Sequence, residues 1–207
     1  MNNFKTEQEN FWAGSFGADY IERNKSSELL ASNLNFFCKS LKNAGPLDSC
    51  VELGANIGMN LKALRMLYPS IKVKGVEINQ QASELLSSLI GKENVFNGSI
   101  FDVPIDLKAD LALIKGVLIH INPDMLPTVY QKLYDSANKY ILIAEYYNPT
   151  PVVIPYRGHQ DRLFKRDFAG EFLDMFPEAS LVDYGFQYRK DTVFPQDDIT
   201  WFLIKKG

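Results

Sequence analysis

The sequence predicts a single α/β domain in which helices cover both faces of a mostly parallel sheet. Three observations predict this fold. An apolar run ends in a glycine turn between Cys50 and Gly58, and a helical pattern follows the turn. Apolar strand patterns then alternate with helical patterns as far as Glu145, and two alternating segments, 181–188 and 199–205, end the chain like an antiparallel pair. Because 207 residues with 46% hydrophobic content can bury one full core, we expect one domain.

The composition limits the kinds of partner. A net charge of −3 argues against a nucleic-acid surface, which needs a clustered basic excess. No segment approaches the roughly 20 apolar residues of a membrane span, and the polar N-terminus is unlike a signal peptide. We expect Cys38 and Cys50 to be small buried residues in a reducing compartment, and we expect no metal site. The sequence therefore predicts a cytoplasmic protein that binds small molecules rather than nucleic acid or membrane.

The glycine turn indicates the kind of ligand. Gly54 and Gly58 let the backbone leave a buried strand sharply and enter a helix over 60–68. A dinucleotide site places a glycine where this chain has Asn56, and Glu52 would repel phosphates. A carboxylate suits a cation, and S-adenosylmethionine carries an ammonium and a sulfonium but no phosphate. The turn thus favours S-adenosylmethionine over a nicotinamide dinucleotide.

The acidic residue and both glycines of this turn, with the elements that follow them, resemble class I S-adenosylmethionine-dependent methyltransferases. The resemblance covers almost the whole chain. It implies one Rossmann-like domain over 1–207, with an N-terminal cap and first helix in 1–43 and the catalytic core in 47–207. It also implies a seven-stranded sheet of order 3-2-1-4-5-7-6, with strand 7 alone antiparallel. The cofactor would lie across the carboxyl ends of strands 1, 2 and 4.

The elements of the first half are predicted from periodicity and from signals at their ends. Ser27 is placed to cap the first helix, and Asn79 to cap the helix that follows the second strand. In chain order we expect a helix over 27–43, the strand, turn and helix of 51–68, a strand over 71–78, a helix between 79 and 91, and a short strand over 95–100.

The second half continues this alternation and then changes. Asn122 followed by Pro123 predicts a helix start, and Asp167 is placed to cap another helix. Continuous apolar character over 140–145 is typical of a parallel strand buried on both faces. In chain order we expect a strand over 110–115, a helix from 122 to 137, the strand over 140–145, an irregular segment over 146–165, a helix over 167–176, and the closing pair.

Glu77 ends the second predicted strand, 23 residues past Gly54. A carboxylate at this spacing accepts the ribose hydroxyls in nucleoside-binding sheets of this kind. The resemblance implies that a residue past the third strand meets the adenine amino group, and Ser99 and Asp102 are both candidates. It further implies cofactor contacts at the turns after the first four strands: Glu52, Gly54, Ala55, Asn56, Gly58, Ile78, Ile100, Lys115, Gly116 and Val117.

An aromatic segment punctuated by glycines, 11–24, precedes the first predicted helix. Tyr20 and Arg23 are three residues apart, so they share a face if the segment is helical. The resemblance implies that this segment caps the cofactor, that Trp12 contacts it, and that Tyr20 and Arg23 reach its methionine carboxylate. The alternative is that these aromatic side chains only anchor the segment by packing.

The irregular segment 146–165 is long for a compact domain and carries prolines, aromatic residues and basic residues. We expect it to form the site of a small anionic acceptor. Tyr146 and Tyr156 would line this site, and Arg157 and Arg162 would pair with the anionic group. The alternative is a solvated charged face.

The two histidines are the candidates for a general base, because only histidine has an ordinary pKa near neutrality. His159 lies among basic residues whose charge would keep it neutral and able to accept a proton, and we prefer it. His120 follows the fourth strand in an apolar run, where the alternative is a packed histidine. An acceptor that is already an anion would need no base.

Three rows of residues, 11–24, 52–60 and 158–163, resemble more narrowly a group of pseudaminic acid biosynthesis-associated methylases. This resemblance implies methyl transfer from S-adenosylmethionine to a sugar or sugar nucleotide of surface-polysaccharide biosynthesis. Two alternatives stay open, namely methylation of another small carboxylate or phosphate compound, and a non-catalytic protein that binds S-adenosylmethionine. The sequence indicates no oligomeric state.

Overall fold

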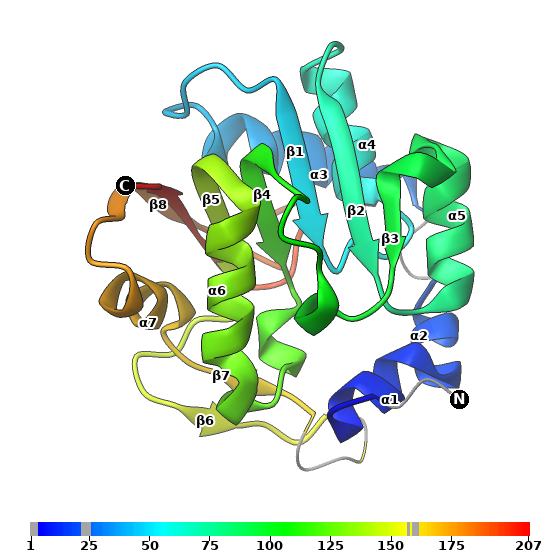
Figure 1. The fold of residues 1–207 in the computed structure, drawn as a ribbon. Helices are drawn as coiled ribbons and strands as arrows, with labels where there is room; N and C mark the ends of the chain where they lie inside the picture. Colours follow the sequence, from blue (N-terminus) through cyan, green and yellow to red (C-terminus); the bar gives the residue numbers. More distant parts are fainter. Residues whose placement is uncertain (1–3, 22–25, 157, 159–161) are drawn as a thin grey trace.

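The structure is a computed structural model that describes residues 4–21, 26–156, 158 and 162–207. Its centre is a seven-stranded sheet of order β3-β2-β1-β4-β5-β9-β8 (Figure 1). Strands β3, β2, β1, β4 and β5 pair in parallel, whereas β9 pairs antiparallel with both β5 and β8. The carboxyl ends of the parallel strands therefore meet at one edge of the sheet, at the bottom of Figure 1.

The elements alternate along the chain as an α/β fold requires. The strands of the main sheet are β1 (Ser49–Leu53), β2 (Lys72–Glu77), β3 (Val95–Asn97), β4 (Ala109–Lys115), β5 (Ala137–Glu145), β8 (Ser180–Gln187) and β9 (Ile199–Lys205). The α-helices are α1 (Glu7–Ala13), α2 (Ser15–Tyr20), α3 (Ser27–Ser40), α4 (Met59–Leu67), α5 (Gln80–Ile90), α6 (Leu126–Ser136) and α7 (Phe168–Met175).

The strand order agrees with the prediction over its first five strands and differs in the numbering of the last two. Two short strands, β6 (Val152–Val153) and β7 (Phe164–Lys165), form a separate antiparallel sheet inside the segment expected to be irregular. The last two strands of the main sheet are consequently β9 and β8. Sequence analysis missed β6 and β7 because two residues are too few to show an alternation.

Capping residues fix several helix starts. Asn79 Oδ1 accepts hydrogen bonds from the backbone N–H groups of Gln81 and Ala82, and Asp167 caps α7 in the same way, so both predicted caps are confirmed. Helix α3 differs, because Ser26 rather than Ser27 accepts the capping hydrogen bond, at 3.1 Å from Leu29 N.

The N-terminal segment is helical earlier than expected. Helix α1 begins at Glu7, where Thr6 and Glu9 form a reciprocal capping box. The Thr-x-x-Glu pattern is visible in the sequence, but the polar residues around it hid the helix. Residues 22–25, which include Arg23, lie outside the described residues, and the structure leaves the role of a cap over a ligand untested.

Two further expectations are corrected. Strand β3 ends at Asn97 rather than at residue 100, because Ser99 Oγ accepts a hydrogen bond from Phe101 N and starts a 3-10 turn over Ile100–Asp102. Cys50 is buried as expected, whereas Cys38 is exposed, since it lies on the outer face of α3.

The hydrophobic core forms one layer on each face of the sheet. Helices α6 and α7 cover one face, where Leu133 and Phe172 are fully buried. Helices α3, α4 and α5 cover the other, with Phe36, Leu61 and Leu86 fully buried. Figure 1 shows α6 and α7 in front of the sheet and α3 behind it. The two layers hold the strand ends, and hence the loops at the carboxyl edge, in fixed positions.

Phe172→Ala should reduce the free energy of unfolding by about 3 to 5 kcal/mol, because the ring is fully buried and packs 4.8 Å from the ring of Phe176. Urea denaturation followed by circular dichroism measures the change. The matched control is Phe186→Ala on β8, whose side chain is 56% exposed and whose loss should cost less than about 0.5 kcal/mol. Equal losses in the two variants would contradict the proposed position of the core.

Candidate active site

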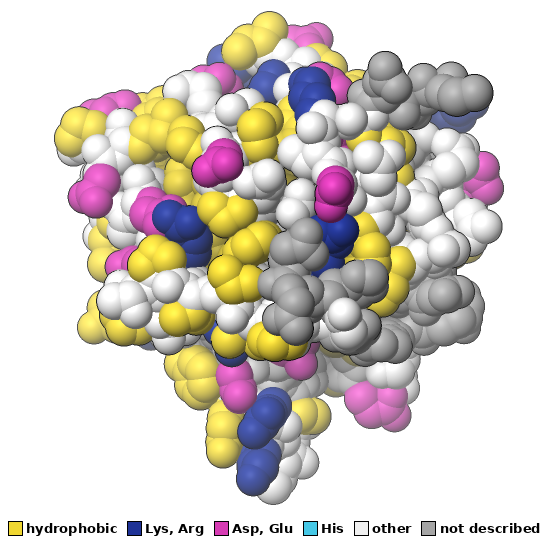
Figure 2. All heavy atoms as spheres, turned by 90° about the horizontal axis from the view of Figure 1, so that it is seen from below, with side chains coloured by type: hydrophobic (Ala, Val, Ile, Leu, Met, Phe, Trp, Pro, Cys, Tyr) yellow, Lys and Arg dark blue, Asp and Glu magenta, His cyan; other side chains and the backbone are white. Residues whose placement is uncertain are grey.

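A cavity of ≈ 680 Å³ lies at the carboxyl edge of the sheet. Its wall is built by the glycine turn after β1, the ends of β2 and β4, helices α1 and α3, the 3-10 turn Leu118–His120, and the segment before β9. Its size suits a small molecule. Figure 2 looks onto this edge, and the visible basic side chains are scattered among acidic and hydrophobic ones rather than gathered in one patch.

The glycine turn is shaped by three residues with positive φ. Gly54 has φ 82° and Gly58 has φ 85°, a region that favours glycine, while Asn56 has φ 49°, which asparagine tolerates better than most residues. A Cβ at Gly54 would lie 2.6 Å from Val117 Cγ2. The turn after β1 and the turn after β4 therefore touch, and a side chain at Gly54 would push them apart.

Glu77 lies at the end of β2, as predicted, and lines the cavity. Its Oε2 accepts a hydrogen bond from Asn56 N and its Oε1 accepts one from Asn79 N, each at 2.7 Å. Burial raises the pKa of this carboxyl, and the backbone hydrogen bonds oppose that rise. Each oxygen keeps a further lone pair, so the carboxylate can still accept hydrogen bonds from a ligand.

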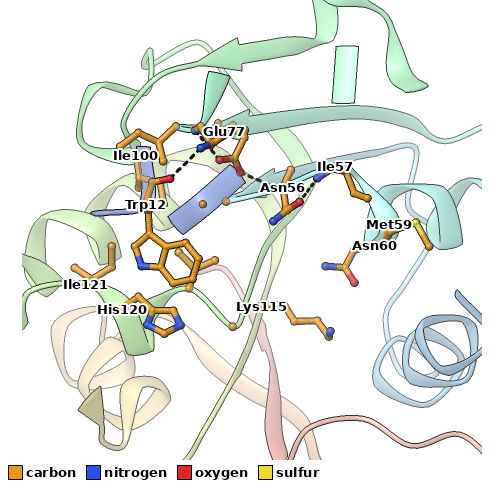
Figure 3. Close-up of a pocket in the computed structure, with 18 of the residues that line it drawn as sticks. Trp12, Asn56, Ile57, Met59, Asn60, Glu77, Ile100, Lys115, His120 and Ile121 are labelled. Atoms are coloured by element: carbon orange, nitrogen blue, oxygen red, sulfur yellow. Dashed lines mark hydrogen bonds between the residues drawn. The ribbon is translucent and has the colours of Figure 1, made fainter. Parts of the chain in front are cut away.

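Asn79 fastens α1 to the core. While its Oδ1 caps α5, its Nδ2 donates to the carbonyl oxygens of Trp12, Ala13 and Gly14 at 3.1 to 3.3 Å. The side chain of Trp12 consequently lies over the cavity beside His120, with ring centroids 4.6 Å apart (Figure 3). Sequence analysis predicted that Asn79 caps α5, and it missed the contacts of this side chain with α1.

Glu52 was expected to meet a cationic ligand, but it does not line the cavity. It is fully buried, and its Oε1 accepts a hydrogen bond of 2.6 Å from Asn60 Nδ2. Burial raises the pKa of Glu52 to about 8, although Asn60 and the ammonium of Lys115 oppose the rise. Glu52 is connected to the cavity by its hydrogen bond to Asn60, which does line it.

His120 is held in one orientation. Its Nδ1 lies 2.7 Å from the carbonyl oxygen of Arg162, and because a carbonyl only accepts, Nδ1 must carry the proton. Nε2 is then the acceptor of the ring. The ring also contacts Trp12 and Tyr156, with centroids 4.6 and 5.3 Å away. Burial lowers the pKa of His120 to about 4, so the imidazole is neutral near pH 7.

Glu145, at the end of β5, holds the turn after β4. Its Oε1 accepts hydrogen bonds from Val117 N and Leu118 N at 2.8 and 2.9 Å. Burial raises the pKa of Glu145 to about 7. Sequence analysis missed this residue, and the only available signal was an acidic side chain at the end of an apolar strand.

The two candidates for contact with adenine are placed differently. Ser99 lines the cavity, together with Ile78 and Ile100. Asp102 instead pairs with Lys5 at 2.6 Å, and its side chain is 59% exposed. The structure thus brings Ser99 to the cavity and leaves Asp102 beside it.

The expected acceptor residues are only partly brought together. Tyr146 and Tyr156 line the cavity, but Arg162 does not. Its guanidinium donates to Glu7 Oε2 at 3.2 Å and lies 5.6 Å from the ring of Phe11, so it is held against α1. Arg157 and His159 lie outside the described residues, as does the side chain of Tyr20.

The cavity extends where sequence analysis predicted no site. This extension is formed by α3 and by the segment between β8 and β9, and its polar lining residues are Asn33, Arg189, Gln196 and Asp197. Within the described ranges, no three His, Cys, Asp or Glu side chains are grouped to hold a metal ion. Nor does any helix in these ranges have the length and apolar character needed to cross a membrane.

Comparison with known proteins identifies the fold. No family model and no curated protein matches the chain. Among solved structures, 1,6-didemethyltoxoflavin-N1-methyltransferase of Burkholderia thailandensis, with bound S-adenosylhomocysteine, superposes with a TM-score of 0.71 at 14% identity, covering 96% of this chain and 86% of that one.

Magnesium protoporphyrin IX methyltransferase of Synechocystis PCC 6803, with bound S-adenosylhomocysteine, gives a TM-score of 0.67 at 15% identity, covering 99% and 100% of the two chains. An S-adenosylmethionine-dependent methyltransferase of Clostridium acetobutylicum gives 0.65 at 13% identity, covering 93% and 98%. The chain therefore has the α/β Rossmann-like fold of S-adenosylmethionine-dependent methyltransferases. At these identities the likeness shows the fold and not the role of any residue.

Glu52→Gln should change how stability depends on pH. In the native state the pKa of Glu52 is about 8 and its ordinary value is 4.5, so between these values only the unfolded chain releases the proton. Glu52 is therefore expected to lower stability progressively as the pH rises from about 4.5 to about 8. The stability of Glu52→Gln relative to the original chain should increase over this window, as measured by urea denaturation at several pH values.

The control for this experiment is Glu84→Gln, at an exposed position on α5. Its stability difference from the original chain should stay constant with pH. A constant difference for Glu52→Gln as well would show that Glu52 is ionised throughout the window.

Proposed function

We propose that the protein is an S-adenosylmethionine-dependent methyltransferase that acts on a small anionic acceptor. The observation that carries this proposal is the cavity at the carboxyl edge, where Glu77 and the positive-φ turn at Gly54 lie at the position that binds ligands in open α/β sheets. The fold shared with methyltransferases that hold S-adenosylhomocysteine supports it.

The residues present fit this cofactor. Both oxygens of Glu77 can accept a ribose hydroxyl, and Ile78 and Ile100 offer apolar surface to a purine ring. Asn60 Oδ1 has no hydrogen-bond partner among the described residues and could accept from an ammonium. When bound, S-adenosylmethionine supplies a methyl group on a sulfonium. The chain would then orient the acceptor oxygen in line with that carbon and exclude water.

His120 would accept the proton of a hydroxyl acceptor. The hydrogen bond from Nδ1 to the Arg162 carbonyl leaves Nε2 with its lone pair, and a neutral ring is the form that accepts a proton. The lowered pKa makes His120 a weak base, so its contribution should be modest. His159, which the sequence favoured, stays an untested alternative.

The acceptor class rests on the sequence. The resemblance to pseudaminic acid biosynthesis-associated methylases supports a sugar or sugar nucleotide of surface-polysaccharide biosynthesis, in the cytoplasm. Proteins of this fold are named for chemically different compounds, such as magnesium protoporphyrin IX and 1,6-didemethyltoxoflavin, so the fold does not select an acceptor. Another small carboxylate or phosphate compound, or binding without turnover, would be separate outcomes of the tests below.

Glu77→Ala should weaken the binding of S-adenosylhomocysteine by roughly 10- to 100-fold, because a charged hydrogen-bond acceptor is worth about 1.5 to 3 kcal/mol. Isothermal titration calorimetry measures the dissociation constant, and thermal denaturation checks that the variant is folded. Glu84→Ala, exposed on α5, serves as control and should bind normally. Binding of NAD by the original chain, with no binding of S-adenosylhomocysteine, would refute the proposal.

His120→Ala should lower turnover by on the order of 10² if the acceptor is a hydroxyl, the lower end of the range for general-base catalysis. The assay follows methyl transfer from labelled S-adenosylmethionine to a panel of acidic sugars and sugar nucleotides. Affinity for S-adenosylhomocysteine should change little. Normal turnover in His120→Ala would exclude this base and leave His159 as the candidate, and normal turnover in His159→Ala as well would favour an acceptor that is already ionised.

A further inference from the structure

The edge strand β8 presents apolar side chains to solvent. It is the last strand of the main sheet, and within the described ranges its only strand partner is β9. Leu181, Tyr184 and Phe186 of β8, and Tyr188 just beyond its end, are 45% to 66% exposed. We call these four residues the β8 strip. Figure 1 shows β8 at the end of the sheet opposite β3.

The pairing with β9 places the strip on one face of the sheet. Leu181 lies opposite Ile204, and Tyr184 lies opposite Phe202. Because Phe202 and Ile204 are two residues apart on β9, Leu181 and Tyr184 share a face in spite of the register shift between them. The other face of β8 packs toward α3, where Gln187 is only 2% exposed. One face of the strand is thus covered and the other is open.

The strip is large for the surface of a monomer. Its three rings are each about half exposed, so they leave roughly 250 to 400 Å² of apolar surface in water. Apolar patches of this size are often functional. In a standard protein interface each partner buries about 800 Å², so the rings alone would supply a third to a half of one side. The edge backbone and the residues that flank it would supply the remainder.

Strand β8 also lacks the usual protection of a sheet edge. Its sequence, Ser180–Gln187, contains no Lys and no Pro, two residues that discourage pairing with another strand. Its one charged side chain, Asp183, accepts a hydrogen bond of 2.8 Å from Asn43 and so is engaged with the segment after α3. The backbone groups on the outer side of β8 have no strand partner among the described residues, and such an edge can pair with a further strand.

We propose that a second copy of this chain pairs with β8 through its own β8, about a two-fold axis normal to the sheet. Identical strands related by such an axis run antiparallel, so the two sheets join into one. The two strips then lie side by side at the junction, where rings from both copies form cross-strand pairs. The exposed Lys190, after β8, also approaches the partner's Glu178, which precedes β8 and is exposed as well.

A second copy fits this surface better than a membrane does. Membrane surfaces attract segments with a basic excess, whereas the residues that flank the strip carry both signs: Glu178, Arg189, Lys190 and Asp191. Self-association uses the open edge and the rings together. It would also steady the cavity, because the segment after β8 supplies Arg189, Gln196 and Asp197 to the cavity lining. The inference does not depend on methyl transfer.

The first experiment is sedimentation velocity of the ligand-free chain between about 1 and 100 µM. The original chain should be mainly a monomer at the lowest concentration, the condition in which Phe186→Ala serves as a stability control, and mainly a dimer at the highest. The double variant Tyr184→Thr/Phe186→Thr keeps residues that suit a strand but loses both rings, and it should raise the dissociation constant at least about tenfold. Ile105→Thr, at a position 69% exposed outside β8, is the matched control and should dimerise normally.

The second experiment measures hydrogen exchange of the original chain at the same two concentrations. The amides of residues 180–188 should gain protection at the higher concentration, because the outer backbone groups become paired. The amides of β3, the other edge of the sheet, should not change and serve as an internal control. This measurement decides the inference even if the double variant fails to fold.

Three results would overturn the inference. One is an original chain that stays monomeric at the highest concentration, including one that instead binds phosphatidylcholine vesicles through the strip. Another is a dimer whose dissociation constant is the same in the folded double variant. The third is a dimer that forms without added protection of 180–188, since its interface would then lie elsewhere.

Discussion

The carboxyl edge of this sheet depends on three buried glutamates at or next to the ends of β1, β2 and β5. Parallel strands leave turns whose N–H groups have no partner in the sheet, and buried N–H groups must be satisfied. Glu77 accepts from the turn after β1, and Glu145 accepts from the turn after β4. Glu52 fixes the first turn of α4 through Asn60. The shape of the cavity follows from these bonds, because they hold in place the loops that line it.

Burying carboxyl groups at one edge has an electrostatic consequence. Burial raises the pKa of Glu52 to about 8 and of Glu145 to about 7, and raises that of Glu77 as well. A carboxyl that holds its proton near neutral pH costs less to bury than an ionised one. A cationic ligand nearby would favour the ionised forms and release protons. In their ionised forms these carboxylates would repel a polyphosphate and attract a sulfonium, which accords with the proposed cofactor.

Features set by near neighbours in the sequence were predictable, and features set by distant partners were not. Gly54, Glu77 and the Asn79 cap follow from local backbone requirements and from the regular spacing of a strand, a turn and a helix. Hydrogen bonds between residues far apart in the sequence are not indicated by any local pattern. Gln196 meets Asn33 across 163 positions and Arg162 meets Glu7 across 155, so no local pattern in the sequence could indicate either contact.

Two contacts that hold the N-terminal segment against the core, an ion pair of Lys5 and the hydrogen bonds of Asn79, differ in strength. The ion pair of Lys5 with Asp102 is largely exposed and contributes about 0 to 1 kcal/mol at most. Asn79 is 4% exposed and offers its amide to three carbonyl oxygens at the end of α1, so losing it would remove the donor that these partly buried acceptors share. Asn79, which caps α5, therefore contributes more to holding α1 than this ion pair does.

Arg162 contacts both α1 and the proposed base, His120. Its carbonyl oxygen fixes the tautomer of His120, while its guanidinium holds α1 through Glu7. The ring of Trp12, carried by α1, packs against the imidazole. Displacement of α1 would remove the Trp12 contact and disturb the segment whose carbonyl orients Nδ1. The Arg162 carbonyl and the Trp12 ring together orient the imidazole, so the position of α1 and the orientation of the proposed base both involve Arg162.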